Sequence, residues 1–392
     1  AVGDGLADRQ WFGVDNSGGV NDGSLYCSYV FTPGTNTSLP GQNQVVRVLR
    51  PGNTAFEPTQ TEVDANATAT QFANVGVDGN GNVHVSYARL NGLGDPTGIW
   101  HAASFDGGTT FQPAVKIANC SFPFSQQNPT THRRENPAVN MAIDTSNNIL
   151  YVVWASQDLG ENTAYLSRST DDGATWSSPF DLTTLSPGAN RQGLFASVGV
   201  NEHGHISVSW FDLSSDGATG IWVTSESFDN GLTFDPAEYV SSASTPFGTY
   251  PATHFFGDYT TTARYGCRSF SAWTDGRNGQ GPKIYVARVE QCSANPVGLP
   301  ELSPLTSDLH LEGIHPNPVA DQLRFTMGLA AASTAEIRLL NMEGKAVLKL
   351  FQGDLEAGTR DYAFAVDGLA AGVYMLYVET ELGVVSRKIV KE

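Results

Sequence analysis

One phrase of eight residues recurs three times in this chain, and it restricts the possible folds more than any other feature. The copies are "SFDGGTTF" at 104–111, "STDDGATW" at 169–176 and "SFDNGLTF" at 227–234. All three fit one template: Ser, any residue, Asp, any residue, Gly, any residue, Thr, then Phe or Trp. A phrase that returns inside a longer repeating unit is typical of a repeat architecture.

The phrase, called the box below, belongs to a unit of about 60 residues with four expected strands. Each unit opens with a short apolar strand that ends in Asp or Asn, at 11–15, 74–78, 140–144 and 197–201. A polar turn, an alternating second strand and a third strand follow. The box closes the third strand and starts a fourth.

A fifth, more divergent copy is expected at 254–289, with strands at 254–260, 268–277 and 283–289. The first copy has a degenerate box at 50–56. Short strands separated by Gly-rich turns predict an all-β protein, and four strands per unit predict the blades of a β-propeller. We expect five blades within residues 1–292. A sixth blade, too degenerate to recognise, stays open.

The box itself is predicted to be a structural turn. Its Asp can accept backbone N–H bonds, its Gly can adopt a positive φ, its hydroxyls can tie the loop, and its aromatic residue can bury apolar surface. The residues with these roles are Ser104, Asp106, Gly108, Thr110, Phe111, Ser169, Asp171, Gly173, Thr175, Trp176, Ser227, Asp229, Gly231, Thr233 and Phe234. The template resembles the Asp-box, or BNR, repeat of sialidases and of many non-enzymatic propellers. That resemblance implies that the boxes lie on the face opposite an active site.

Function in a propeller is expected on the other face, where the loops before first strands and after second strands meet. The candidate residues there are Asp8, Arg9, Arg134, Glu135, Arg191, Tyr250, Asp275 and Arg277. Converging arginines can bind a carboxylate in a bidentate manner, and carboxylates with a Tyr can supply an acid and a nucleophile. Resemblance to sialidases implies an arginine triad, a Tyr–Glu pair and an Asp.

Some of these residues also have a simpler interpretation. The segment "DRQWFGV" at 8–14 departs from the Phe/Tyr-Arg-Ile-Pro context of sialidases, which leaves a catalytic role for Arg9 open. Arg277 and Asp275 can form a local ion pair, and 133–135 can be a solvated loop. Whether the chain is an enzyme therefore stays open.

No metal motif and no cofactor are expected. The segment "DGNGNVHVSYAR" at 78–89 begins like a calcium loop, but Val83 and Arg89 occupy the positions of the required Gly and Glu. A polar hairpin turn is the favoured interpretation. A structural Ca²⁺ among loop carboxylates stays open, although no motif marks a site.

Charge, hydropathy and cysteines bound the class of protein. The formal net charge of −18 disfavours nucleic acid as a partner, because phosphate contacts need clustered Lys and Arg. No apolar run approaches the roughly 20 residues that span a bilayer, and the opening at Ala1 suits a processed protein. Cys267 and Cys292 are predicted to form a disulfide, Cys27 is expected to be a core thiol, and the pairing of Cys120 stays open.

The C-terminal part differs in composition. Residues 293–311 are rich in Pro and Ser and are expected to be a linker. Residues 312–392 predict a small antiparallel β-sandwich with strands at 314–327, 336–350, 368–379 and 384–392, and with turns at Gly344 and Gly372.

Four motifs in this segment carry a further resemblance: Pro316-Asn317-Pro318, a Leu-Asn-x-x-Gly-Lys turn at Gly344, a Leu-x-x-Gly-x-Tyr stretch through Gly372 and Tyr374, and a final strand with Arg387 and Lys388. Together they resemble the type A sorting domain of the type IX secretion system of Bacteroidota. The resemblance implies that outer-membrane secretion machinery is a partner. It also implies a protein that is secreted or attached to the cell surface.

Three functions remain open after this reading. The preferred one is a secreted or cell-surface propeller that binds a glycan or another extracellular polymer. The alternatives are an exo-sialidase-like glycoside hydrolase and a structural or assembly component of the cell surface. The ligand, the oligomeric state and the fate of the sorting domain after export are not predicted.

Overall fold

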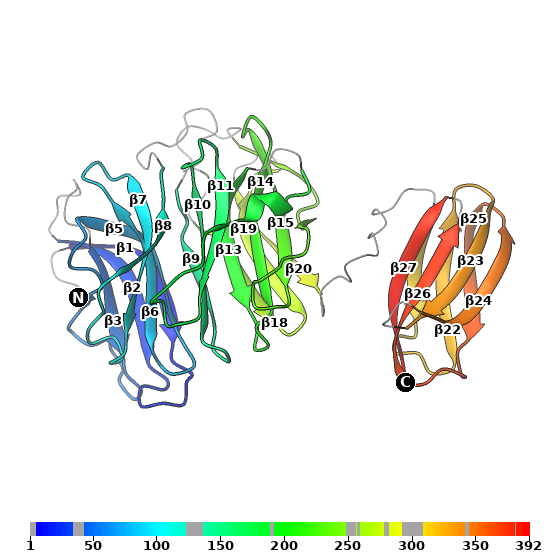
Figure 1. The fold of residues 1–392 in the computed structure, drawn as a ribbon, viewed down its shortest axis with the longest axis horizontal. Helices are drawn as coiled ribbons and strands as arrows, with labels where there is room; N and C mark the ends of the chain where they lie inside the picture. Colours follow the sequence, from blue (N-terminus) through cyan, green and yellow to red (C-terminus); the bar gives the residue numbers. More distant parts are fainter. Residues whose placement is uncertain are drawn as a thin grey trace. The chain divides into compact units, whose positions relative to one another are not determined.

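The computed structural model divides into two compact units, Ala1–Asn295 and Pro296–Glu392, and each is described by itself (Figure 1). The predicted linker lies at their junction. The structure describes residues 5–33, 43–122, 136–188, 192–247, 256, 259–277, 282–291, 309–341, 345–380 and 382–392.

The described residues of the first unit form five antiparallel sheets that follow one another along the chain. The first sheet contains β1 (Gly5–Val14), β2 (Leu25–Pro33), β3 (Asn43–Leu49) and β4 (Thr61–Glu62). The second contains β5 (Ala69–Val77), β6 (Val83–Leu90), β7 (Pro96–Ser104) and β8 (Val115–Asn119). The third contains β9 (Asn140–Asp144), β10 (Ile149–Ser156), β11 (Thr163–Ser169) and β12 (Phe180–Asp181), which precedes the 3-10 helix η1 (Leu182–Leu185).

The fourth sheet contains β13 (Gly193–Val200), β14 (Ile206–Leu213), β15 (Thr219–Ser227) and β16 (Glu238–Tyr239), and β17 (Thr245–Pro246) also pairs with β15. The fifth contains β18 (Thr261–Tyr265), β19 (Arg268–Asp275) and β20 (Lys283–Glu290). The first strands pack in order: β1 on β5, β5 on β9, β9 on β13, and β13 on β18. This arrangement is that of propeller blades around a common axis, so the predicted all-β propeller is confirmed.

The predicted first strand of the fifth copy was misplaced. It was expected at 254–260, but β18 begins at Thr261, and most of 254–260 lies outside the described residues. In β18 the buried residues are Thr262 and Arg264. Polar residues on the buried face carry no hydropathy signal, which explains the error.

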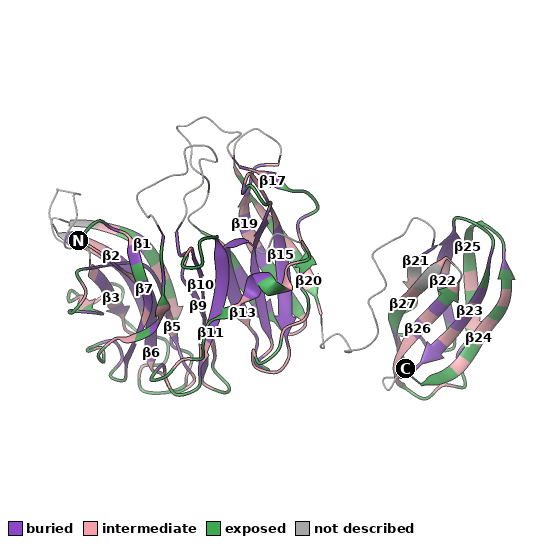
Figure 2. Ribbon diagram, turned by 45° about the horizontal axis from the view of Figure 1, so that its top comes forward, coloured by how far each residue is buried: buried purple, intermediate pink, exposed green. Residues whose placement is uncertain are grey.

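Aromatic side chains fill the spaces between the sheets. Trp154, Trp210 and Trp222 are fully buried, and the Trp222 ring stacks on Trp273 of the fifth sheet at a centroid distance of 5.6 Å. Such pairs contribute about 1 kcal/mol beyond their buried area. Every residue of β14 is buried. In contrast, β20 at the end of the series is exposed or half-buried throughout (Figure 2).

Each box begins at the last residue of a third strand, as predicted. In the third sheet the Asp171 carboxylate accepts hydrogen bonds from Ser169 Oγ (2.8 Å), Thr175 N (2.9 Å) and Thr175 Oγ1 (2.5 Å). The backbone N–H of Gly173 donates to Ser169 Oγ at 3.0 Å, and Gly173 has a φ of 83°. The boxes at 104–111 and 227–234 make the same bonds. Each box is thus a turn that is closed by hydrogen bonds among its own residues.

The second unit is a sandwich of two antiparallel sheets. One contains β21 (Leu309–His315), β22 (Gln322–Leu329) and β25 (Gly358–Ala365). The other contains β24 (Ala346–Leu355), β23 (Ser333–Leu340), β26 (Gly372–Thr380) and β27 (Gly383–Lys391). β21 begins at Leu309, two residues before the predicted end of the linker, and β25 was not predicted. Gly372 starts β26 rather than forming a turn, because the turn falls on the preceding residues; Gly344 lies outside the described residues.

The predicted sorting residues hold the ends of this unit together and mark one edge. Asn317 Oδ1 accepts the backbone N–H of Val390 at 2.8 Å, and its amide nitrogen donates to the Lys388 carbonyl at 3.3 Å. The flanking Pro318 follows a cis peptide bond, and Tyr374 Oη donates to the Ala370 carbonyl at 2.9 Å. The remaining members of the predicted signal are Pro316, Arg387 and Lys388, all exposed.

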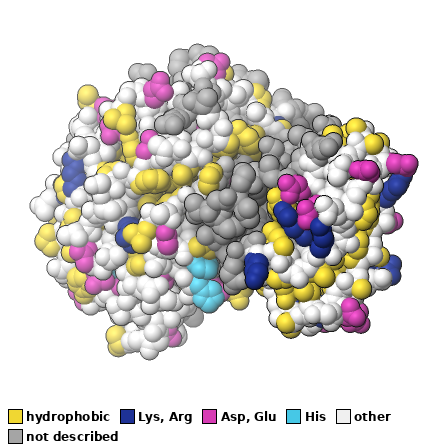
Figure 3. Space-filling model, turned by 45° about the vertical axis from the view of Figure 1, so that its right-hand side comes forward, with side chains coloured by type: hydrophobic (Ala, Val, Ile, Leu, Met, Phe, Trp, Pro, Cys, Tyr) yellow, Lys and Arg dark blue, Asp and Glu magenta, His cyan; other side chains and the backbone are white. Residues whose placement is uncertain are grey.

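Cys27 and Cys120 are buried free thiols, and Cys267 is disulfide-bonded. The predicted partner of Cys267, Cys292, lies outside the described residues. None of the helices in the described part of the chain is both long and apolar enough to cross a membrane. On the face that Figure 3 presents, basic, acidic and hydrophobic side chains are interspersed.

Candidate functional site

The first strands of the propeller share an unusual backbone feature on the face opposite the boxes. Arg9 in β1, Phe72 in β5 and Phe195 in β13 have φ values of 56°, 59° and 56°, each at an interruption of the strand register. Ala138, just before β9, has a φ of 45°. Left-handed backbone costs a non-Gly residue about 1 kcal/mol or more and clusters at ligand sites. The repeats therefore hold strain at one common level.

A pocket lies at this level. It has a cavity volume of about 30 Å³ and is partly open to solvent. Its lining comes from β1, β5, the residues leading into β9 and the residues leading into β18, namely Arg9, Trp11, Phe72, Ala73, Ala138, Val139, Asn140, Tyr259 and Thr260. Four of the five sheets therefore meet around one opening, called the central pocket below.

Arg9 supplies the charge of the central pocket. Its guanidinium carbon lies 4.3 Å from the centre of the Phe72 ring and 5.8 Å from that of Tyr259. Its backbone N–H donates to the Asp8 carboxylate at 2.9 Å, and the residue is 8% exposed. An arginine beside aromatic rings is attracted to their faces, and its planar guanidinium matches the geometry of a carboxylate. The described lining residues include no carboxylate.

Of the described residues predicted for this face, Asp275 and Arg277 do not line the central pocket. Asp275 and Arg277 pair with each other, with Arg277 Nη2 2.6 Å from Asp275 Oδ2, and Arg277 stacks on Tyr285 at 4.4 Å. Asp275 also accepts a bond from Trp273 Nε1 at 3.0 Å. This is the local ion pair that the sequence left open. Arg134, Glu135, Arg191 and Tyr250 lie outside the described residues.

The electrostatics of Asp275 fit a structural role. Burial raises the pKa of its carboxyl group, but hydrogen bonds from Arg277 and Trp273 outweigh burial and hold that pKa below the ordinary value. The hydrogen bond to Asp275 in turn raises the pKa of Arg277. A carboxylate that is stabilised as an anion and paired with an arginine is a poor proton donor.

Sequence reasoning missed the aromatic part of the central pocket. Trp11, Phe72 and Tyr259 were not singled out, because each falls in a strand or loop of ordinary composition. One signal was available: when the units are aligned on their first strands, Phe72 takes the position of Arg9. That alignment would have placed the two side chains on the same level of the axis.

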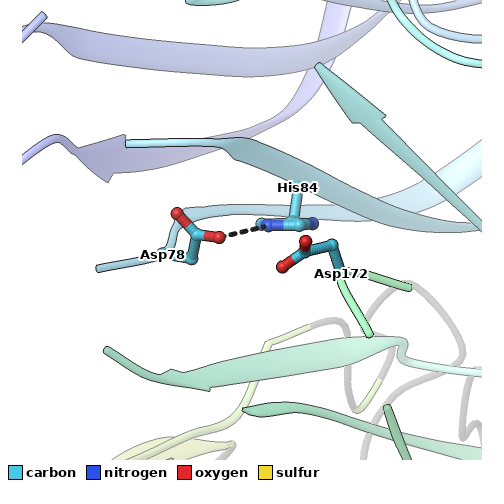
Figure 4. A group of neighbouring side chains, drawn as sticks. All are labelled: Asp78, His84 and Asp172. Atoms are coloured by element: carbon cyan, nitrogen blue, oxygen red, sulfur yellow. Dashed lines mark hydrogen bonds and ion pairs between the residues drawn. The ribbon is translucent and has the colours of Figure 1, made fainter. Parts of the chain in front are cut away.

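A second group of polar side chains lies on the box face, between the second and third sheets. Figure 4 shows Asp78 and His84 from one sheet with Asp172 of the next box directed at them. Asp78, His84 and Asp172 each offer one ligand atom, and these atoms lie within 4.8 Å of one another. His101 contacts His84, and burial, followed by the neighbouring His84, holds the pKa of His101 well below its usual range. Among the described residues this group could hold a metal ion.

The fold is that of a β-propeller followed by a small β-sandwich, and a family comparison identifies the second unit. Residues 313–392 match the family model described as the secretion system C-terminal sorting domain. The predicted sorting domain is confirmed, and it implies the type IX machinery as a partner. The protein is therefore secreted or attached to the outer-membrane surface.

Comparisons of the whole chain are more remote. The chain matches no curated protein. It is similar to a protein of unknown function from Dyadobacter fermentans DSM 18053, with 14% identity, 92% of this chain and 95% of that chain covered, and a TM-score of 0.48. It is also similar to Hadza microbial sialidase Hz136, with 15% identity, 94% of this chain and 77% of that chain covered, and a TM-score of 0.40. Bacillus subtilis levansucrase has 10% identity, with 75% of this chain and 89% of that chain covered and a TM-score of 0.40. At these TM-scores the likenesses carry no functional assignment.

Proposed function

We propose that the propeller is an extracellular binding module that takes a glycan or a similar polymer at the central pocket. The observation that carries this proposal is the position of Arg9, a buried cation held against Phe72 and beside Tyr259 at the propeller axis. The sorting domain supports the proposal, because it delivers the propeller to the side of the envelope where such polymers occur.

The chemistry of the central pocket fits an acidic sugar. A guanidinium group can hold a carboxylate through two parallel N–H bonds, which adds geometric selectivity to the attraction of opposite charges. Trp11 and Tyr259 offer apolar faces for the carbon side of a sugar ring, and Asn140 and Thr260 add polar groups. The preferred ligand class is therefore a polysaccharide with uronate- or sialate-type carboxylates.

The test is binding of acidic and neutral oligosaccharides to the full chain by glycan array, followed by calorimetry on the best ligand. Arg9→Ala is expected to lose binding of acidic ligands. The matched control is Arg277→Ala, which removes another arginine stacked on an aromatic ring but lies outside the central pocket. Equal losses in the two variants, or no acidic ligand at all, would refute the proposal.

A sialidase-type hydrolase is the second candidate, and Arg9 in the central pocket is the observation in its favour. Retaining and inverting glycosidases need two acidic groups or an equivalent nucleophile beside the bond that is cleaved. The described lining residues supply none. We therefore expect no fluorophore release from a fluorogenic sialoside. Release that disappears in an Arg9→Ala/Arg191→Ala double variant would replace the binding proposal with this one.

An assembly role is the third candidate, and one surface favours it. The face of the fifth sheet turned away from the fourth exposes Phe270 (42%), Ile284 (69%) and Val286 (67%). Exposed apolar side chains grouped on one sheet face are common at protein interfaces. Light scattering of the full chain at rising concentration tests this role, and a monomer at all concentrations would count against self-assembly.

A further inference from the structure

The separation of two side chains between the second and third sheets suits a metal ion. His84 Nε2 lies 3.3 Å from Asp78 Oδ2, longer than the roughly 2.9 Å that is usual for an N–H···O bond. Two ligands bound tetrahedrally at about 2.0–2.2 Å lie roughly 3.3–3.6 Å apart. The pair therefore has the spacing of two ligands that share an ion.

A third side chain arrives from the neighbouring blade. Asp172 occupies the fourth position of the box at 169–176, and a carboxylate oxygen lies within 4.8 Å of the ligand atoms of Asp78 and His84. Among the described residues, nothing donates a hydrogen bond to the Asp172 carboxylate, and no Lys or Arg pairs with it or with Asp78. A buried and a half-buried carboxylate side by side repel each other unless a cation lies between them.

The surroundings hold the ligands in place. His84 Nδ1 lies 3.1 Å from His101 Nε2, and both rings are buried. Asn82 donates to both oxygens of Asp78, through its backbone N–H at 2.8 Å and its side-chain amide at 2.9 Å. Partners of this kind on the far side of a ligand fix its orientation and tautomer in metal sites.

The propeller contains its own comparison. Tyr151 of the third sheet occupies the position that His84 has in the second. In each sheet this residue comes directly after the one that pairs with the first Ser of that sheet's box. Asp144 there corresponds to Asp78, and Asn230 of the following box corresponds to Asp172. The same blade architecture therefore forms with a Tyr in place of His84 and an Asn in place of Asp172. The fold itself does not require His84 and Asp172, so their co-occurrence needs another reason.

We propose that Asp78, His84 and Asp172 bind one divalent transition-metal ion of the zinc type between the second and third blades. One imidazole nitrogen and two carboxylate oxygens are ligands that suit zinc, and three protein ligands leave one position for water. The bound ion links the box of the third blade to the second sheet. This site lies on the face opposite the central pocket and is independent of the proposed function.

The test is titration of the metal-stripped full chain with Zn²⁺ and, separately, with Co²⁺. We expect one Zn²⁺ per chain by elemental analysis, a higher melting temperature with Zn²⁺, and visible Co²⁺ absorption bands of a four-coordinate site. The titration uses a His203→Ala background, since the neighbouring rings of His203 and His205, with centroids 6.0 Å apart, could bind zinc adventitiously.

Asp172→Asn is the decisive variant. Asn tolerates the left-handed φ of 56° at this position, as Asn230 does in the next repeat with 61°, so the variant should fold. It is expected to lower the affinity for Zn²⁺ at least about tenfold and to abolish the Co²⁺ bands. The control is Asn230→Asp, which places a carboxylate at the equivalent interface without a histidine and should bind no second ion. Unchanged affinity in Asp172→Asn, or no Zn²⁺ binding by the parent, would overturn the proposal.

Discussion

The two ends of the propeller blades differ in what their repeats have in common. At one end the three boxes repeat nearly the same residues and the same hydrogen bonds. At the other end the backbone repeats but the side chains vary: Arg9, Phe72, Ala138 and Phe195 share a left-handed φ, but their side chains are a cation, a methyl group and, in two cases, an aromatic ring. A propeller therefore repeats side chains where they hold the fold. It repeats only backbone where side chains are free to differ.

The physical reason lies in how each end is satisfied. In a box, one carboxylate receives hydrogen bonds from a Ser and a Thr of the same eight residues, so a change at any of these residues removes a bond within the box. At the pocket end, the irregular backbone positions a side chain but does not depend on its chemistry. The predictions below test this contrast.

The largest effect is expected from Gly173→Ala on the box side. A Cβ at this position would collide with the buried His101 ring, and alanine is strained at a φ of 83°. Overpacking and backbone strain together should lower the free energy of unfolding by about 3 kcal/mol or more. The measurement is urea unfolding of the full chain, with ligand binding by the folded fraction expected to persist.

Gly108→Ala and Gly231→Ala are the matched controls. Their added Cβ atoms would lie 3.2 Å from Tyr26 and 3.1 Å from Ile206, close enough to crowd but not to collide. Each should cost about 1–2 kcal/mol, mostly from the positive φ. If all three variants lost the same stability, the buried His101 ring would have to move aside for the added Cβ at position 173.

Arg9→Gly is expected to have the opposite pattern. Glycine adopts a φ of 56° without strain, which offsets the lost stacking on Phe72, so the melting temperature should change little. Loss of one charge-assisted contact should weaken binding of an acidic glycan about 30-fold, equivalent to about 2 kcal/mol. Calorimetry and thermal melts on the same samples measure both. A large drop in melting temperature with intact binding would reverse the assignment of the two ends.

The same contrast explains what could be predicted from the sequence. The box was recognised because Ser169, Asp171, Gly173 and Thr175 interact with one another, so their chemistry is written in adjacent letters. The sorting domain was recognised for a similar reason: Asn317 and its neighbours form short motifs in a fixed order. The repeated sheets of the propeller were predicted from the spacing of the first strands and the boxes along the chain.

The central pocket could not be predicted because it depends on contacts between units. Arg9 and Tyr259 are far apart in the sequence, and no residue type signals a left-handed φ at an Arg or a Phe. Asp275 and Arg277 carried the right chemistry but satisfied each other locally. The group at Asp78 and Asp172 was missed because its ligands come from two repeats, whereas the calcium loop that was considered lies within one.

We expect acid to lower the stability of the protein through the three box aspartates. Burial raises the pKa of Asp106, Asp171 and Asp229, but hydrogen bonds from the box threonines and serines outweigh it, so all three pKa values lie below the ordinary one. A carboxyl group with a lowered folded-state pKa adds stability above its unfolded pKa of about 3.9, and this stability is lost as pH falls through the folded value. Melting temperature should therefore fall below about pH 4 from this source.

A triple variant with Asn at the three box aspartates provides the control for that pH profile. It should be less stable than the parent at pH 7, because the anionic acceptors are gone. Its melting temperature should decline less between pH 5 and pH 3, because these three groups no longer titrate. Parallel curves for parent and variant would show that the box carboxylates do not contribute to acid sensitivity.

The smallest effects are expected from Thr110→Val, Thr175→Val and Thr233→Val. Each removes one hydroxyl bond to the box carboxylate, of 2.6, 2.5 and 2.6 Å respectively, and keeps the shape of the side chain. Each should cost about 1 kcal/mol, since the site is exposed and water can replace the donor. Because the boxes share no partners, the triple variant should lose the sum of the single losses within about 0.5 kcal/mol. One box that departed from the others in urea unfolding would show that the repeats are not equivalent at this end, and the comparison between the two ends would fail.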